Sequence, residues 1–203
     1  MEEKNISEHE SLLIIQQMIQ SAKREQRDSG KGWIVWGWRL FLASVLTVFN
    51  LHFRWFQTYF FWNLFGIATI VIFLYEIIMA RISKKPQRVR TYTRDLFEKL
   101  NIGFFISLMF IIVSMNLNLS PMLGFPLLVN VYGFWILIYG TATNFKPSIF
   151  GAYMAWAFGI AALFVETFEW VMIMHALAVL FGYIIPGHIA NLAFRKTEAV
   201  HSV

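Results

Sequence analysis

Six long apolar runs constrain this chain more than any other feature of its sequence. A bilayer core about 30 Å thick is crossed by about 20 mostly apolar residues in a helix. Runs of this kind predict six membrane-spanning helices, at residues 32–51, 56–80, 100–117, 122–142, 148–165 and 170–194. The predicted fold is therefore all-α, a polytopic membrane protein. Residues 1–31 are expected to form a cytoplasmic amphipathic helix, residues 32–194 the six-helix transmembrane bundle, and residues 195–203 a short cytoplasmic tail.

The composition agrees with a membrane protein. Hydrophobic residues make up 58% of the chain and charged residues 14%, whereas a soluble domain averages about 45–50% apolar and about 25% charged residues. A disordered chain is excluded, because disorder requires low hydrophobicity and high charge. The chain has no cysteine, which excludes disulfides, thiolate metal sites and cysteine nucleophiles.

Basic residues gather on one predicted side of the membrane. Most of the 17 Lys and Arg residues lie before the first span, in residues 81–99, at Lys146 or after the sixth span, and the other side has Arg54. This bias predicts cytoplasmic N and C termini in the inner (plasma) membrane. The basic segment 81–99 is expected to attract anionic lipid headgroups of the bilayer. Nucleic acid is not an expected partner, because no recognisable nucleic-acid module is present.

Residues 7–27 predict an amphipathic helix before the first span. Ser7 and Glu10 have the spacing of a capping box. Apolar residues recur behind them at helical spacing: Leu12, Ile15, Ile19 and Ala22. Three roles stay open for this stripe: the membrane interface, a helix of a second copy or of a partner, and the protein's own cytoplasmic end.

Two ionisable residues lie inside predicted spans. Arg39 lies about seven residues, roughly 10 Å, into the first span, and Glu76 lies about four residues from the cytoplasmic end of the second. Spans joined by a short loop pack antiparallel, so these depths are comparable, and we predict an Arg39–Glu76 ion pair. In the alternative, Arg39 reaches the headgroups and Glu76 reaches cytoplasmic water.

Further polar residues are predicted at the cytoplasmic end of the sixth span. Pro186 removes a backbone hydrogen bond and Gly187 loosens the helix, so a kink or break is expected there. His188 and Asn191, one turn apart, would then lie near Tyr139 of the fourth span in a cytoplasm-facing polar cluster. The alternative is a kinked helix end at the water interface.

Polar residues toward the opposite side are expected to be mostly loop or span-end residues in contact with water. They are Asn50, His52, Asn63, Asn116, Asn118, Asn130, Glu166, Glu169 and His175. Glu166, Glu169 and His175 offer oxygen and nitrogen ligands to a metal. Their spacing matches no ligand motif, so no metal site is predicted.

Gly151, Ala155 and Gly159 fall at four-residue intervals in the fifth span. Small residues at this spacing let another helix approach closely, either inside the bundle, which we favour, or at a dimer interface. The sequence holds no Ser-His-Asp order, no glycine-rich phosphate loop and no mid-membrane pair of carboxylates. We therefore predict no catalytic residue and no cofactor.

Two stretches carry a resemblance to known proteins. The segments "LIYGTATNFKPSIFGAYMAWAFG" (residues 137–159) and "LAVLFGYIIPGHIANL" (residues 177–192) resemble a group of small multi-pass bacterial membrane proteins with no established activity. The segment "ESLLIIQQMI" (residues 10–19), followed by "WGW" (residues 36–38), is similar to the same group. The resemblance implies a bacterial inner-membrane protein and no particular chemistry.

These features of the sequence are compatible with three functions. The first is a non-enzymatic inner-membrane protein that acts through a homo-oligomer or a protein partner. The second is a small transporter or channel in which Arg39, Glu76 and His188 line a cytoplasmic vestibule. The third is an intramembrane enzyme that uses His188 or Glu76.

Overall fold

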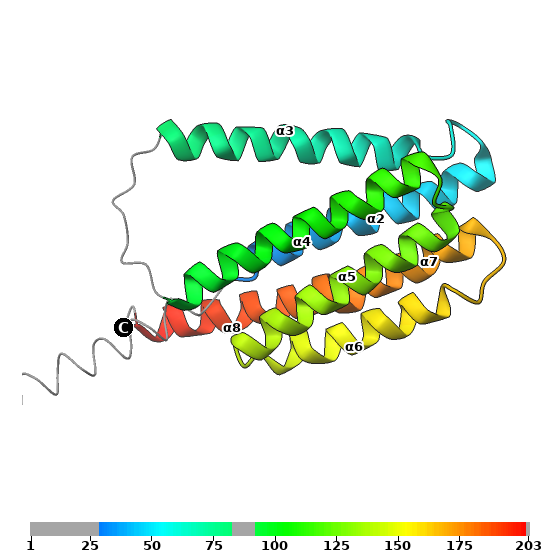
Figure 1. Cartoon of the computed structure of the whole chain (residues 1–203). Coiled ribbons are helices and arrows are strands. Elements are labelled where there is room, and N and C mark those ends of the chain that lie inside the picture. Colours follow the sequence, from blue (N-terminus) through cyan, green and yellow to red (C-terminus); the bar gives the residue numbers. More distant parts are fainter. Residues whose placement is uncertain (1–28, 83–91, 202–203) are drawn as a thin grey trace, which may run out of the picture.

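The structure of the protein, a computed structural model, describes residues 29–82 and 92–201. In this part of the chain, six helical rods run back and forth and no strand forms (Figure 1). The rods are α2 (Lys31–Phe53), α3 (Phe60–Ile82), α4 (Tyr92–Leu117), α5 (Pro121–Ala142), α6 (Lys146–Ala161), and a continuous rod of α7 (Phe168–Val179), the π-helical turn η1 (Leu180–Ile184) and α8 (Ile185–His201). The all-α prediction is confirmed. The predicted amphipathic helix at residues 7–27 and the central part of the basic segment lie outside the described residues.

Four of the described helices are long and apolar enough to cross a membrane. They comprise Lys31–Phe53, Leu96–Leu117, Pro121–Ala142 and Phe168–Lys196, and they are compatible with a membrane protein. The apolar helix Phe60–Ile72 is a shorter candidate. Helix α6 has 16 residues, about 24 Å at 1.5 Å per residue.

The packed centre of the bundle consists of α2, α5, α6 and the α7–η1–α8 rod, with α3 and α4 beside it (Figure 1). Ile136, Val171 and Met172 are fully buried there. Helix α3 packs against α2, whereas α4 packs against α5. The outward faces of both flanking helices are strongly apolar, as at Ile67 and Phe110, which suits contact with lipid.

The connection between α2 and α3 is held by one buried amide. The Nδ2 of Asn50 donates to the carbonyls of Phe56 (3.2 Å) and Gln57 (3.0 Å), and its Oδ1 accepts from the N–H of Phe56 (2.8 Å). These bonds satisfy backbone groups of the turn, where Arg54 adopts a left-handed conformation. Asn50 is 1% exposed, so it is not one of the water-contacting residues that most of its group were expected to be.

Where a kink was expected near Pro186, the rod contains the π-turn η1. The N–H of Ile185 donates to the carbonyl of Leu180, five residues back, which widens the helix locally. Pro186 has no N–H to offer to the α-helical ladder. The widened turn therefore lies just before Pro186, the residue that cannot donate to a regular α-helical hydrogen bond.

Candidate functional site

A cavity of about 880 Å³ lies between α3 and α4, beside the beginning of α2 and the end of α5. Helix α3 packs against α2 and α4 packs against α5, and the ribbons of α3 and α4 lie apart in Figure 1. The volume falls within the range of small-molecule sites, about 300–1,000 Å³. The cavity is therefore large enough for a ligand with an extended apolar part.

Arg39 supplies the positive charge of this cavity. It lies on α2, is half-buried, and holds its guanidinium carbon 5.9 Å from the centroid of the Trp36 ring. A cation–π contact of this kind uses the face of the ring, and it engages none of the five N–H donors of the guanidinium. Those donors can bind an acceptor that enters the cavity.

Two aromatic clusters form much of the wall. The ring centroids of Trp33 lie 4.6 Å from Tyr139 and 5.0 Å from Tyr183, which joins α2, α5 and η1. On the other side, Phe104 of α4 stacks on Trp135 of α5 at 5.1 Å. Such rings offer large apolar surfaces at little cost in conformational entropy, so they suit contact with an apolar ligand body.

A few other polar groups interrupt the apolar wall. Glu98 and Asn101 of α4 line the cavity and are exposed. Thr69 of α3 also lines it, and its Oγ1 is buried without a hydrogen-bond partner among the described residues. A small number of polar groups in an apolar site is the usual arrangement for fixing the orientation of a ligand.

The structure brings together one residue predicted for the cytoplasmic vestibule and one predicted for the polar cluster of the sixth span. Arg39 and Tyr139 both line the cavity. Glu76 lies on α3, but its side chain is outside the described part of the structure, so the Arg39–Glu76 ion pair stays a prediction. His188 is exposed on α8 and is not one of the described residues that line the cavity.

Asn191 has a contact of its own. Its Nδ2 donates to the carbonyl of Ser29 at 2.8 Å, which ties α8 to the beginning of α2. At this crossing Gly30 has a φ of 68°, and a Cβ placed on it would lie 2.5 Å from the carbonyl oxygen of Gly187. This clamp therefore needs a glycine and joins the two helices without involving His188.

His175 lies in the core, unlike the water-contacting loop and span-end residues that most of its group were expected to be. It is 1% exposed, and its Nδ1 lies 2.8 Å from the Oγ of Ser44 on α2. The rings of Trp62, Phe125 and Tyr132 meet the imidazole roughly at right angles, with centroids 5.2–5.8 Å away. Its Nε2 is buried without a partner among the described residues.

The candidate metal ligands are not assembled. The described residues hold no group of three His, Asp or Glu side chains that could bind a metal. Glu166 and Glu169 are exposed near the start of α7, while His175 is enclosed by aromatic rings. The arrangement around His175 is that of a packed core residue.

The small residues of α6 face inward. Gly151, Ala155 and Gly159 are buried. A Cβ on Gly151 would lie 2.6 Å from the Phe181 carbonyl oxygen of η1, and one on Gly159 would lie 2.9 Å from Val129 of α5. This face therefore lets α6 approach both neighbours closely.

Comparison with protein-family models, with curated protein sequences and with solved structures finds no match for this chain. The resemblance to small multi-pass bacterial membrane proteins therefore stays a prediction.

Proposed function

We propose that this protein is an integral membrane protein that binds an anionic amphiphile in the cavity between α3 and α4. The observation that carries the proposal is Arg39, a half-buried cation against Trp36 within a largely aromatic and aliphatic wall. A charge inside a membrane protein is costly and is usually paired. A carboxylate, phosphate or sulfate on the ligand would pair with the guanidinium fork through two parallel hydrogen bonds.

The apolar part of the ligand would lie along the wall away from Arg39. Ile70 of α3 and Phe105 and Met109 of α4 line the cavity. Burying a hydrocarbon body against these side chains contributes about 0.8 kcal/mol per CH₂ relative to water. An ion without an apolar body would lack this contribution, so we expect selection for amphiphiles over free anions.

This proposal develops the transporter alternative in a revised form, with Arg39 and Tyr139 in the cavity and His188 away from it. The proposed activity is ligand binding without a chemical reaction. A ligand from the cytoplasmic leaflet is favoured, because Arg39 lies in the N-terminal half of α2, which starts on the proposed cytoplasmic side. Anionic lipids in that leaflet attract basic segments, such as residues 81–99.

Arg39→Gln is expected to weaken binding of an anionic lipid about tenfold or more, since a hydrogen bond to a charged group contributes about 1.5–3 kcal/mol. The measurement is native mass spectrometry of the full-length protein in mild detergent, titrated with phosphatidylglycerol, phosphatidylethanolamine or inorganic phosphate. Phosphatidylglycerol should form a one-to-one complex, whereas the zwitterionic lipid and free phosphate should bind weakly.

Arg54→Gln is the matched control, because Arg54 is exposed at the other end of α2. It should leave phosphatidylglycerol binding unchanged. Equal binding by the Arg39→Gln variant and the unsubstituted protein would contradict the proposal. If inorganic phosphate bound as tightly as phosphatidylglycerol, the proposed selectivity for an amphiphile would be contradicted, and the cavity would hold only a site for anions.

We further infer six spans in the inner (plasma) membrane, with both termini on the cytoplasmic side. Lys31 at the start of α2, Arg81 at the end of α3, Lys146 at the start of α6 and Arg195 in α8 belong to helix ends on one side of the bundle (Figure 1). Glu166 belongs to the opposite side. This distribution supports the positive-inside assignment.

The absence of cysteine from the sequence makes the topology testable with single-cysteine variants. Trp55→Cys and Ile82→Cys flank α3, while Ala142→Cys and Glu166→Cys flank α6, and all four positions are exposed. In intact cells an impermeant maleimide should label Trp55→Cys and Glu166→Cys only. Labelling of both members of a pair from one side would show that the intervening helix does not span.

A further inference from the structure

The outward face of α5 carries a stripe of exposed residues with a regular spacing. Leu123, Leu127, Asn130, Phe134 and Thr141 are all exposed. Their intervals are four, three, four and seven residues, and the half-buried Leu137 divides the last interval into three and four. Alternation of three and four is the heptad spacing by which two helices pack along a left-handed seam.

Asn130 is the polar member of this stripe. It lies near the middle of α5, which is long and apolar enough to span a membrane. Its backbone carbonyl accepts from the Nε1 of Trp156 at 3.1 Å, while its amide has no hydrogen-bond partner among the described side chains. An amide exposed to hydrocarbon is unfavourable until it finds a partner.

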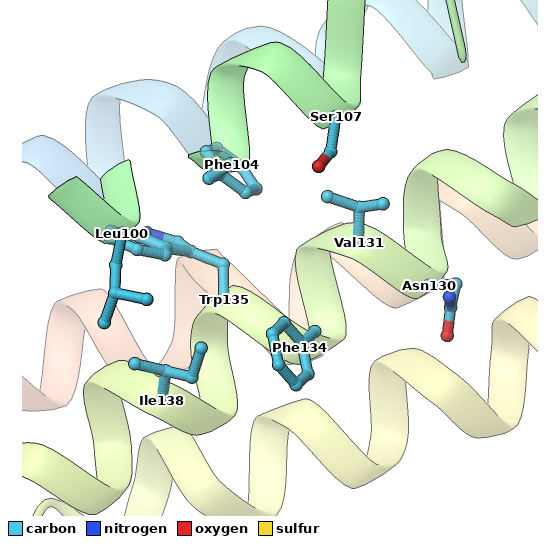
Figure 2. Close-up of a pocket in the computed structure, with 8 residues that line it drawn as sticks. All are labelled: Leu100, Phe104, Ser107, Asn130, Val131, Phe134, Trp135 and Ile138. Carbon is cyan, nitrogen blue, oxygen red and sulfur yellow. The ribbon is translucent and has the colours of Figure 1, made fainter. Parts of the chain in front are cut away.

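A groove of about 160 Å³ runs beside the stripe, between α4 and α5. In Figure 2, Ser107, Val131 and Asn130 lie toward one end of the groove, and Leu100, Trp135 and Ile138 toward the other. A cavity of about 150 Å³ is known to hold benzene, so the groove has room for a phenyl ring. Phe134, at the edge of the groove, is 58% exposed.

We propose that two copies of this chain pair through α5, with Asn130 of each copy bonded to the partner's Asn130. The amide suits this pairing because it carries both a donor and an acceptor, so two identical groups related by a two-fold axis satisfy each other. The same symmetry offers the Phe134 ring of each copy to the groove of the other. A single polar residue on such a seam also fixes the register of the two helices.

The exposed stripe of α5 is separate from the ligand cavity, although the groove beside the stripe shares Phe104 and Trp135 with the cavity wall. Cross-linking in native membranes tests it directly, because the sequence has no cysteine. Leu127→Cys should form a disulfide-linked dimer on oxidation. Tyr153→Cys, at a similarly exposed position on α6, should stay monomeric. Equal cross-linking at the two positions would overturn the proposal, and so would a Leu127→Cys adduct with a different protein.

Asn130→Leu tests the amide itself. Förster transfer between labelled copies in phosphatidylglycerol–phosphatidylethanolamine vesicles should show a dimer dissociation constant raised about 3- to 30-fold, the effect of losing interhelical polar hydrogen bonds in a membrane. Asn130→Gln keeps an amide and should retain most of the association. Asn63→Leu, at an exposed position on α3, should change nothing. An unchanged dissociation constant for Asn130→Leu, or a monomer at all protein-to-lipid ratios, would overturn the proposal.

Discussion

Gly151→Leu is expected to prevent α6 from docking on the π-turn and to lower the free energy of unfolding by about 3 kcal/mol or more. A Cβ at this position would lie 2.6 Å from the carbonyl oxygen of Phe181 and 3.3 Å from the Cα of Gly182. Both atoms are backbone, so they cannot rotate aside as a flexible side chain would. Thermal unfolding of the purified protein in mild detergent measures the effect.

Gly103→Leu is the matched control for this substitution. Gly103 lies inside α4, and a Cβ there would have nothing within 4 Å. The same chemical change should therefore leave the melting temperature nearly unchanged. If both variants lost the same stability, the damage would come from leucine itself and not from the contact between α6 and η1.

The six helical rods of the described residues could be predicted from the six apolar runs, because polar connections separate the runs. Which side of each helix packs against the bundle cannot be predicted in the same way. In α5, Asn130 is exposed and Tyr132 is buried, although both are polar interruptions of one apolar run. Hydrophobicity does not separate a lipid-facing side from a protein-facing side when both are apolar.

The cavity, too, could be predicted from the sequence only in part. Arg39 could be singled out from the sequence because an arginine inside an apolar run is rare and costly. The cavity around it arises because α3 packs against α2 and α4 packs against α5. Both pairings join consecutive helices, as expected for apolar runs joined by short loops, whereas nothing in the sequence indicates that the consecutive helices α3 and α4 leave a cavity between them.

The contacts of His175 and Asn191 could not be predicted from the sequence, for the same physical reason. Ser44, the partner of His175, is 131 residues away in the chain, and Ser29, the partner of Asn191, is 162 residues away. Sequence position near a predicted span end suggested water for His175, where packing instead provides a hydroxyl and three aromatic rings. The buried amide of Asn50 differs, since its partners lie six and seven residues away, and a turn-capping asparagine could have been proposed.

The second large effect is expected for His175→Ala, which should lower the free energy of unfolding by about 2–4 kcal/mol. The substitution removes a ring that is 1% exposed and leaves a cavity among Trp62, Phe125 and Tyr132. Truncations of large buried side chains cost this much when the surroundings collapse only in part. Thermal unfolding in mild detergent again provides the measurement.

His175→Phe separates the packing of the ring from its hydrogen bond. The Ser44 hydroxyl donates to the Leu40 carbonyl at 2.9 Å, and its oxygen lies 2.8 Å from the imidazole Nδ1. It can therefore keep a partner when the imidazole is replaced, and a polar hydrogen bond between membrane helices is worth only about 0.6 kcal/mol on average. A phenyl ring also removes the buried Nε2 that has no described partner.

His175→Phe should consequently recover most of the stability lost in His175→Ala. A double-mutant cycle of His175 with Ser44→Ala should give a coupling energy below about 1 kcal/mol. A His175→Phe variant as unstable as His175→Ala would instead show that the imidazole nitrogens, and not the filled volume, hold α2 and α7 together.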